Sequence, residues 1–196
     1  DETQVYYNII DMSASTSPYW HCGVQVDEGT GVKFWNNTIY SPRKMGIVVR
    51  ATAGTGAINA EVKNNIVHSA TGYGLMVDTN SQTGLVSNNN IFYNSTTADV
   101  YWGGVFTSAV TGPTGGTEYT LAAYQALTGQ DSNSVTSDPK LTLAPPVAIT
   151  DYKLLDGSPA INAGTDVGLT SDYEGKIVPQ GLNFDIGAYE YGLFGR

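Results

Sequence analysis

The chain has 196 residues, of which only 14% are charged, and its formal net charge is −9. This length suffices for one domain with an extended core. Nucleic acids and anionic membrane surfaces select clustered Lys and Arg, so the acidic balance argues against both as partners. No apolar stretch approaches the length of a membrane-spanning helix, and we therefore expect no membrane insertion.

A short block recurs about every 25 to 30 residues in the first half of the chain, and a strand-like run follows each copy. The blocks are Tyr7–Ile10, Asn37–Tyr40, Asn64–Val67 and Asn89–Phe92. The runs that follow them are Gly23–Asp27, Gly46–Arg50, Gly74–Asp78 and Asp99–Trp102. Short β-branched runs at this period predict an all-β solenoid of about four rungs over residues 1–106.

Asparagines recur within the first block. With the isoleucine as the register mark, one offset holds Asn37, Asn64 and Asn89, and the next holds Asn8, Asn65 and Asn90. Residues at equal offsets stack at the strand spacing of roughly 4.8 Å. Asn tolerates left-handed backbone and forms side-chain ladders, so we interpret these residues as a corner of the solenoid. Sugar binding is the alternative.

The remaining chain divides into two segments. Residues 107–150 contain a predicted loop over Val110–Gly116 and one short helix over Thr120–Leu127, ended by Gly129. Leu121, Tyr124 and Leu127 share a face of that helix that could dock on the solenoid. Residues 151–196 return to short strands and turns, which we expect to close the end of the same domain as a lid.

The tail carries a motif known from another group of proteins. Its characteristic segments are Leu121–Tyr124, Thr128–Asp131, Asp138–Pro139, Asp151–Leu154, Gly157–Thr165 and Asp185–Tyr191. They resemble the C-terminal portion of right-handed parallel β-helix repeat proteins of the pectate-lyase-like superfamily. This resemblance implies a right-handed parallel β-helix, and an extracellular or cell-surface location. The family includes polysaccharide lyases, glycoside hydrolases and adhesins, so the motif does not choose an activity.

One charged constellation stands out. Asp27, Arg50 and Asp78 each lie four residues after the first residue of their run, so they should stack on one edge of three rungs. Their structural interpretation is an ion-pair ladder that fixes register. Their functional interpretation is a catalytic set, because a lyase needs a group that neutralises the uronate carboxylate and a base that takes the C5 proton.

Further residues are candidates for substrate binding on the same rungs. These are Lys33, Lys63, His68, Trp35 and Trp102. Aromatic residues that face outward would form platforms for sugar rings. The aromatic residues of the rungs are Tyr19, Trp20, Trp35, Tyr40, Tyr93, Tyr101 and Trp102.

We therefore expect an extracellular carbohydrate-recognising β-helix with polysaccharide as its partner, the C-terminal part of a lyase-like protein. The first alternative is a non-catalytic structural or adhesive module that associates end to end through its uncapped first rung into filaments. The second is a glycoside hydrolase, which needs two facing carboxylates. No dedicated metal motif is present in the sequence; the acidic charge makes calcium the cation to consider.

Overall fold

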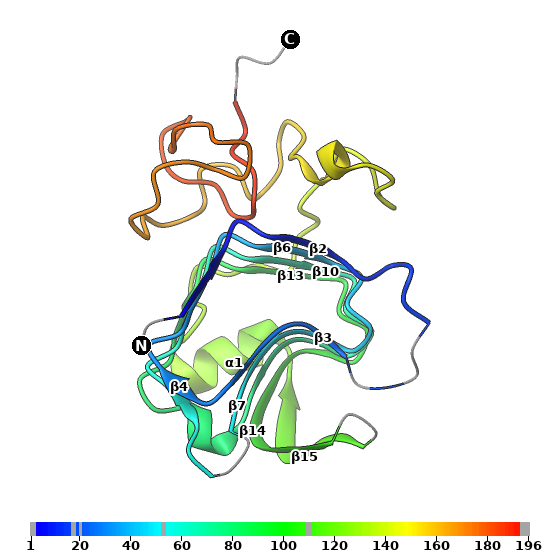
Figure 1. Cartoon of the computed structure of the whole chain (residues 1–196), viewed down its shortest axis with the longest axis vertical. Coiled ribbons are helices and arrows are strands. Elements are labelled where there is room, and N and C mark those ends of the chain that lie inside the picture. Colours follow the sequence, from blue (N-terminus) through cyan, green and yellow to red (C-terminus); the bar gives the residue numbers. More distant parts are fainter. Residues whose placement is uncertain (1–2, 17–18, 20, 52–53, 109–110, 193–196) are drawn as a thin grey trace.

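The computed structural model describes residues 3–16, 19, 21–51, 54–108 and 111–192. Its first part is a parallel β-solenoid in which each coil of the chain adds one strand to each of three sheets (Figure 1). The lateral sheet contains β1 (Gln4–Tyr6), β5 (Lys33–Trp35), β9 (Glu61–Lys63) and β12 (Val86–Asn88). The predicted all-β solenoid of four rungs is confirmed.

The other two sheets complete each coil. The tail-facing sheet contains β2 (Ile9–Asp11), β6 (Thr38–Tyr40), β10 (Ile66–His68) and β13 (Ile91–Tyr93). The long sheet contains β3 (Cys22–Asp27), β7 (Met45–Arg50), β11 (Tyr73–Val77), β14 (Ala98–Ser108) and β15 (Gly112–Tyr119). Short pieces link the coils: β4 (Gly29–Thr30), β8 (Ala57–Ile58) and the 3-10 turn η1 (Thr79–Ser81).

The core fills the inside of the coil, because alternate residues of each strand point inward. Each sheet contributes rows of apolar side chains, one from each rung. The lateral sheet gives Val5, Phe34 and Val62, and the tail-facing sheet gives Ile10, Ile39, Val67 and Phe92. The outer face of the long sheet is also apolar, with Met45, Val48, Tyr73, Met76 and Tyr101 buried.

An asparagine ladder runs inside the corner between the lateral and tail-facing sheets. Asn8, Asn37 and Asn65 each donate both their backbone N–H and their side-chain Nδ2 to Oδ1 of the asparagine one rung further on, over 2.9–3.1 Å. The next asparagine after Asn65 is Asn90. The ladder therefore satisfies the backbone and side-chain donors of three asparagines with the side-chain oxygens of the next three.

The sequence-based alignment of the repeats was wrong by one residue in the second rung, where it grouped Asn37 with Asn64 and Asn89. Thr38, not Ile39, lies opposite Ile9 and Ile66, so Asn37 belongs to the ladder with Asn65. The corner residues that precede the ladder are Tyr7, Asn36, Asn64 and Asn89, all with φ between 50° and 57°. The corner interpretation is correct, and the isoleucine was the wrong register mark in that rung.

Helix α1 (Leu121–Thr128) covers the C-terminal end of the core. Gly129 ends the helix at φ 71°, as the sequence predicted. Thr120, which the sequence placed inside the helix, is its N-cap, and the Thr120 hydroxyl accepts from the N–H of Ala123 at 3.3 Å. Leu121 and Tyr124 are buried against the core, but Leu127 is 58% exposed and takes no part in the docking. The predicted loop over 110–116 is wrong from Gly112 onward, where β15 pairs antiparallel with β14.

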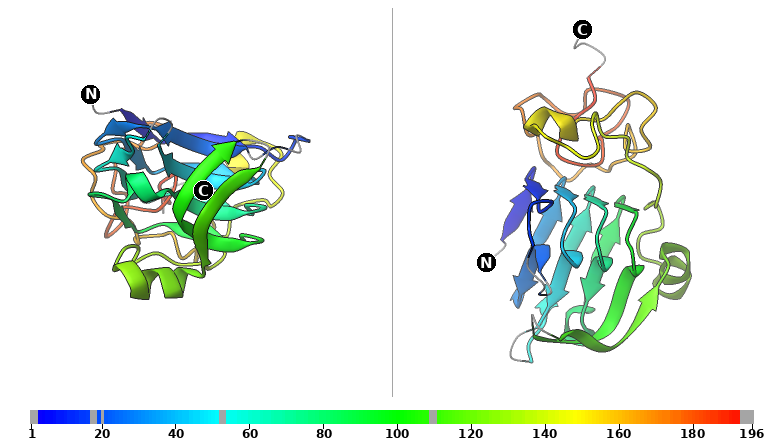
Figure 2. Two further views of the ribbon diagram at one scale, coloured as in Figure 1. Left: turned by 90° about the horizontal axis from the view of Figure 1, so that it is seen from below. Right: turned by 90° about the vertical axis from the view of Figure 1, so that its right-hand side faces the viewer.

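The tail lies on the outer face of the tail-facing sheet and does not close the end of the coil as the predicted lid (Figures 1 and 2). Its only helical piece among the described residues is η2 (Ile149–Tyr152). Ile66 and Ile91 of the sheet pack with Leu154 and Ile186 of the tail in a second apolar cluster. The outer face of this sheet is apolar, so it needs such a cover, and the tail supplies it.

Candidate functional site

The outer face of the lateral sheet brings together three of the predicted substrate-binding residues. Strand register places Tyr6, Trp35 and Lys63 in one row, and Lys33 and Glu61 in the neighbouring row. Alternation sends all five side chains outward while Val5, Phe34 and Val62 point into the core. We call these five residues the lateral face.

The side chains of the lateral face contact one another. The Lys33 ammonium lies 5.1 Å from the centroid of the Trp35 ring, and Lys63 Nζ lies 2.6 Å from Glu61 Oε2. Trp35 is only 8% exposed and forms the floor, whereas Tyr6 is 45% exposed. The face thus offers one accessible ring and two ammonium groups, which can donate hydrogen bonds to hydroxyl or carboxylate oxygens.

Asp27 and Arg50 lie opposite each other on β3 and β7, as the sequence predicted. Arg50 donates from Nε and Nη2 to both carboxylate oxygens of Asp27, and Gln25 Nε2 donates to the same carboxylate at 2.8 Å. The Arg50 guanidinium also lies 4.5 Å from the centroid of the Phe106 ring. These hydrogen bonds from Arg50 hold the pKa of Asp27 below its usual value.

Asp78 continues this row but is enclosed. Val77 pairs with Val49, so Asp78 is level with Arg50 on the next rung. It is 1% exposed, and its Oδ2 accepts from the backbone N–H of Ala51 at 2.5 Å. Arg50 therefore pairs with Asp27, whereas Asp78 bonds to the backbone, and among the described residues its Oδ1 is buried without a hydrogen-bond partner.

Two other predicted substrate-binding residues lie away from the lateral face. Trp102 points into the core, with its ring 5.2 Å from that of Tyr124. His68 is buried beneath the tail between Tyr40 and Tyr93, at centroid distances of 4.7 and 4.8 Å. Burial lowers the pKa of His68. Neither ring is placed to meet a ligand together with Trp35.

The predicted aromatic platforms are mostly enclosed. Tyr40 and Tyr101 are buried, Tyr93 is half-buried and Tyr19 is exposed. Trp20 lies outside the described residues. Outward-facing rings on the described rungs are therefore fewer than the sequence suggested, and Tyr6, which was not singled out, is the accessible one on the lateral face.

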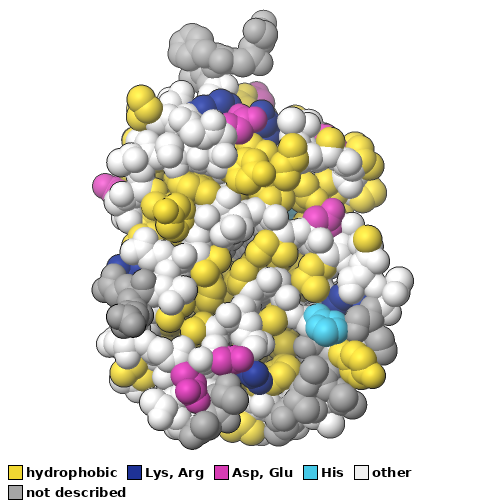
Figure 3. Space-filling view, viewed as in Figure 1, with side chains coloured by type: hydrophobic (Ala, Val, Ile, Leu, Met, Phe, Trp, Pro, Cys, Tyr) yellow, Lys and Arg dark blue, Asp and Glu magenta, His cyan; other side chains and the backbone are white. Residues whose placement is uncertain are grey.

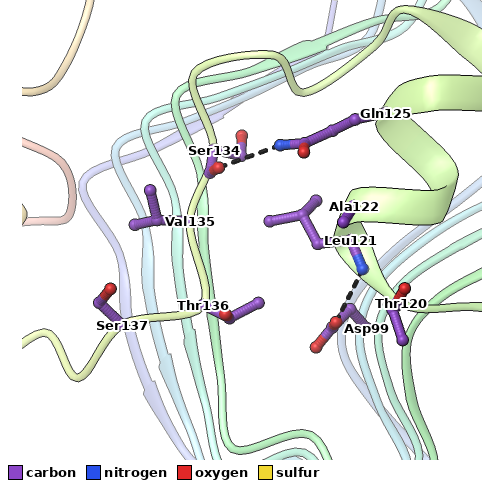
Figure 4. Close-up of a pocket in the computed structure, with 9 residues that line it drawn as sticks. All are labelled: Asp99, Thr120, Leu121, Ala122, Gln125, Ser134, Val135, Thr136 and Ser137. Atoms are coloured by element: carbon purple, nitrogen blue, oxygen red, sulfur yellow. Dashed lines mark hydrogen bonds between the residues drawn. The ribbon is translucent and has the colours of Figure 1, made fainter.

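A hollow of about 510 Å³ lies beside α1 at the C-terminal end of the coil (Figure 4). Its lining includes Asp99, whose strand position is that of Gly74 one rung earlier. Asp99 Oδ2 accepts from the N–H of Leu121 at 2.8 Å, so the carboxylate anchors the first turn of α1. Burial raises the pKa of Asp99. An Asp at the glycine position was the sequence signal for this anchor, which the site prediction missed.

Carboxylates of the tail staple its loops. Asp172 Oδ1 accepts from the N–H groups of Glu174 and Lys176, both at 2.9 Å. Asp185 accepts from the N–H groups of Asn162 and Tyr191, both at 2.6 Å, and burial raises its pKa to about 6. Across the described part of the chain, no three His, Cys, Asp or Glu side chains form a group that could hold a metal ion such as calcium.

Comparison with known protein families gives a match. A family model described as right handed beta helix region matches residues 2–114, which is more than half of the chain. The match covers all four rungs and fixes the hand of the coil. A comparison with curated proteins finds no match. Among the described residues, no helix has the length and apolar character needed to cross a membrane.

Proposed function

The chain belongs to the right-handed β-helix family, and we propose that it binds polysaccharide through its lateral face without cleaving it. One observation carries this proposal. Three successive rungs present Tyr6, Trp35 and Lys63 in one row, with Lys33 alongside. An extended glycan running across the rungs would meet an apolar ring face and then ammonium donors.

The electrostatics of the lateral face support this choice of site. The chain carries a net charge of −9, but Lys33, Glu61 and Lys63 give the lateral face one excess positive charge. Hydroxyl groups of a neutral glycan and carboxylates of a uronate glycan both accept hydrogen bonds from ammonium groups. The salt dependence of binding separates these two cases, because screening weakens an exposed ion pair much more than a neutral contact.

The geometry favours binding over elimination. A lyase needs an arginine that is free to pair with the substrate carboxylate, and Arg50 already makes a two-pronged pair with Asp27. A base must reach the proton that it abstracts, and Asp78 is buried. We therefore assign Asp27, Arg50 and Asp78 to the fold, and we propose an extracellular or cell-surface role for the binding face.

A polysaccharide panel tests this proposal. The chain is titrated into neutral glucans and into uronate polymers at low and high salt, and binding is followed by calorimetry. The same samples are read for unsaturated-uronate absorbance and for new reducing ends. Binding without either product supports the proposal. Uronate absorbance would establish a lyase, reducing ends alone would establish a hydrolase, and absence of binding to every polymer would reject the lateral face.

A further inference from the structure

The tail contains a hollow that takes no part in glycan binding at the lateral face. Its volume is about 350 Å³, at the lower end of the range for small-molecule sites. Its lining includes Asp156, Ile161, Asn162, Gln180 and Tyr191, and we call it the tail hollow. These residues come from separate segments of the tail, which packs on the outer face of the tail-facing sheet (Figures 1 and 2).

Two buried carboxyl groups hold the walls of the tail hollow together. Asp185 accepts from the backbone N–H groups of Asn162 and Tyr191, both at 2.6 Å, and Glu190 accepts from the N–H of Gln180 at 3.1 Å. The N–H of Asp185 donates to Glu190 at 2.9 Å, which links the two anchors. Both carboxyl groups are buried, so water has little access to these bonds. The walls are therefore fixed before a ligand arrives, which reduces the entropic cost of binding.

The side chain of Asn162 is oriented on the wall of the hollow. Its Oδ1 accepts from the N–H of Asn183 at 2.9 Å, and within the described part of the chain Nδ2 keeps both hydrogens for a ligand. The amide lies against Gly181, where a Cβ would meet Asn162 Oδ1 at 2.3 Å. Glycine at position 181 thus provides the room that this amide occupies.

The polar groups of the tail hollow suit a ligand that carries hydroxyl groups. Asn162 Nδ2 donates, whereas the Asp156 carboxylate accepts. Gln180 donates from Nε2 to a backbone carbonyl of the tail, so its Oε1 is a second acceptor. Ile161 and Tyr191 add apolar surface. A sugar ring matches this mixture, because each hydroxyl both donates and accepts while the C–H groups of the ring form an apolar face.

An ionic ligand fits the tail hollow less well. Among the described residues that line it, none is Lys, Arg or His, so an anion such as phosphate would meet no cation there. Asp156 is the one carboxylate of this lining and is exposed, so water would screen its attraction for a cation. Charged side chains are also few on the face that Figure 3 shows, which leaves no broad field of either sign on it.

We propose that the tail hollow binds a single pyranose ring. Asn162 Nδ2 donates to one hydroxyl of the sugar, Asp156 and Gln180 accept from others, and the ring lies on the apolar surface of Ile161 and Tyr191. This inference is independent of the lateral face, where a glycan would bind along its length.

NMR titration of the isotope-labelled chain tests this proposal. Methyl pyranosides of glucose, galactose, mannose and xylose are added up to about 50 mM, and the side-chain amide signals of Asn162 are followed. We expect at least one of them to shift these signals with a dissociation constant of about 1 to 10 mM. Asp156→Ala should weaken this binding at least about fivefold, because it removes an acceptor at an exposed position where the fold tolerates change.

Two further variants serve as controls. Asp166→Ala removes another exposed carboxylate of the tail, which does not line the hollow, and Tyr6→Ala removes the accessible ring of the lateral face. Both should bind the pyranoside as tightly as the parent does. Gly181→Ala should weaken binding, because its Cβ displaces the Asn162 amide.

Three results would overturn the proposal. Unshifted Asn162 signals at the highest concentration of every pyranoside would show that the tail hollow takes no sugar. Equal affinity of the parent and Asp156→Ala would place the binding elsewhere on the chain. Loss of pyranoside binding in folded Tyr6→Ala would assign it to the lateral face.

Discussion

Ser134 takes the place of a fifth asparagine beside Asn90. The N–H of Asn65 donates to Asn90 Oδ1 at 2.9 Å, and the N–H of Asn90 donates to Ser134 Oγ at 2.7 Å. The Ser134 hydroxyl in turn donates to Asp131, which also accepts from Asn90 Nδ2. The segment after α1 thus ends the ladder with oxygen acceptors, and the stack has a defined direction from donors to acceptors.

The interior of the ladder should be costly to interrupt. Asn65→Ala removes the acceptor for the N–H and Nδ2 of Asn37 and the donor to Phe34 O, all in buried surroundings. We expect a loss of about 3 kcal/mol in the free energy of unfolding, because buried polar groups then lack partners. Urea unfolding measures this loss. Asn133→Ala on the exposed surface is the control and should stay within about 0.5 kcal/mol of the parent; equal costs for both variants would contradict the ladder.

The pKa of Asp185 predicts that stability falls as pH rises. Burial raises this pKa from 3.8 to about 6 in the folded chain, so the protonated form is favoured by folding. The resulting stabilisation is fully present below the unfolded pKa and is lost as pH rises through about 6. The stability difference between the parent and Asp185→Asn should therefore shrink by about 2 kcal/mol from pH 4 to pH 7 in urea unfolding. A difference that stays constant over this range would contradict the assignment.

Asp27 should show the opposite pH dependence. The hydrogen bonds from Arg50 lower its pKa, so its stabilisation is present above the unfolded value and is lost as pH falls through the folded value. Asp27→Asn should cost about 0.5 kcal/mol at pH 7, since the Asp27 side chain is 38% exposed and solvent screens the pair. This cost should vanish at pH 2. Unfolding curves of the variant at the two pH values check the sign, and a cost that grows toward low pH would refute it.

Replacing Arg50 should affect the stability of the fold, whereas replacing Lys33 should affect glycan binding. Arg50→Ala removes the pair with Asp27 and the contact with Phe106, so we expect a loss of about 1 to 2 kcal/mol with unchanged glycan affinity. Lys33→Ala should weaken glycan binding and leave the thermal midpoint within about 2 °C of the parent. Calorimetric titration and thermal unfolding of both variants give the comparison. Loss of glycan affinity in a folded Arg50→Ala variant would instead place the binding site at Asp27, Arg50 and Asp78.

Repetition explains how much of this fold could be predicted. Residues at equal offsets in the repeat predicted that Asp27 stacks on Arg50 and that the asparagines form a corner with left-handed backbone conformation. Both predictions follow because a solenoid places residues one repeat apart next to each other in space. The end of the helix could be predicted from Gly129, because its capping role is local. The register slip at Asn37 arose because both Thr38 and Ile39 suit a strand, and only pairing distinguishes them.

The parts without repetition could not be predicted in this way. The pairing of β15 with β14 depends on Gly104 and Gly116, where a Cβ would meet backbone atoms at 2.3 and 2.5 Å. The placement of the tail depends on long-range contacts, such as Asn36 Nδ2 with Asp185 O at 3.1 Å. Whether Trp35 or Trp102 faces outward depends on which alternate residues of its strand point into the core. The length of the repeat does not determine this, so both residues remained candidates.

The most direct test of glycan binding compares two tyrosines with matched exposure. Tyr6 on the lateral face is 45% exposed and stacks edge-on with Tyr7, while Tyr173 on the tail is 44% exposed and stacks edge-on with Tyr189. Calorimetric titration of the tightest-binding polysaccharide should show affinity reduced at least about fivefold in Tyr6→Ala and unchanged in Tyr173→Ala. Equal affinity of the parent and folded Tyr6→Ala would contradict recognition at the lateral face.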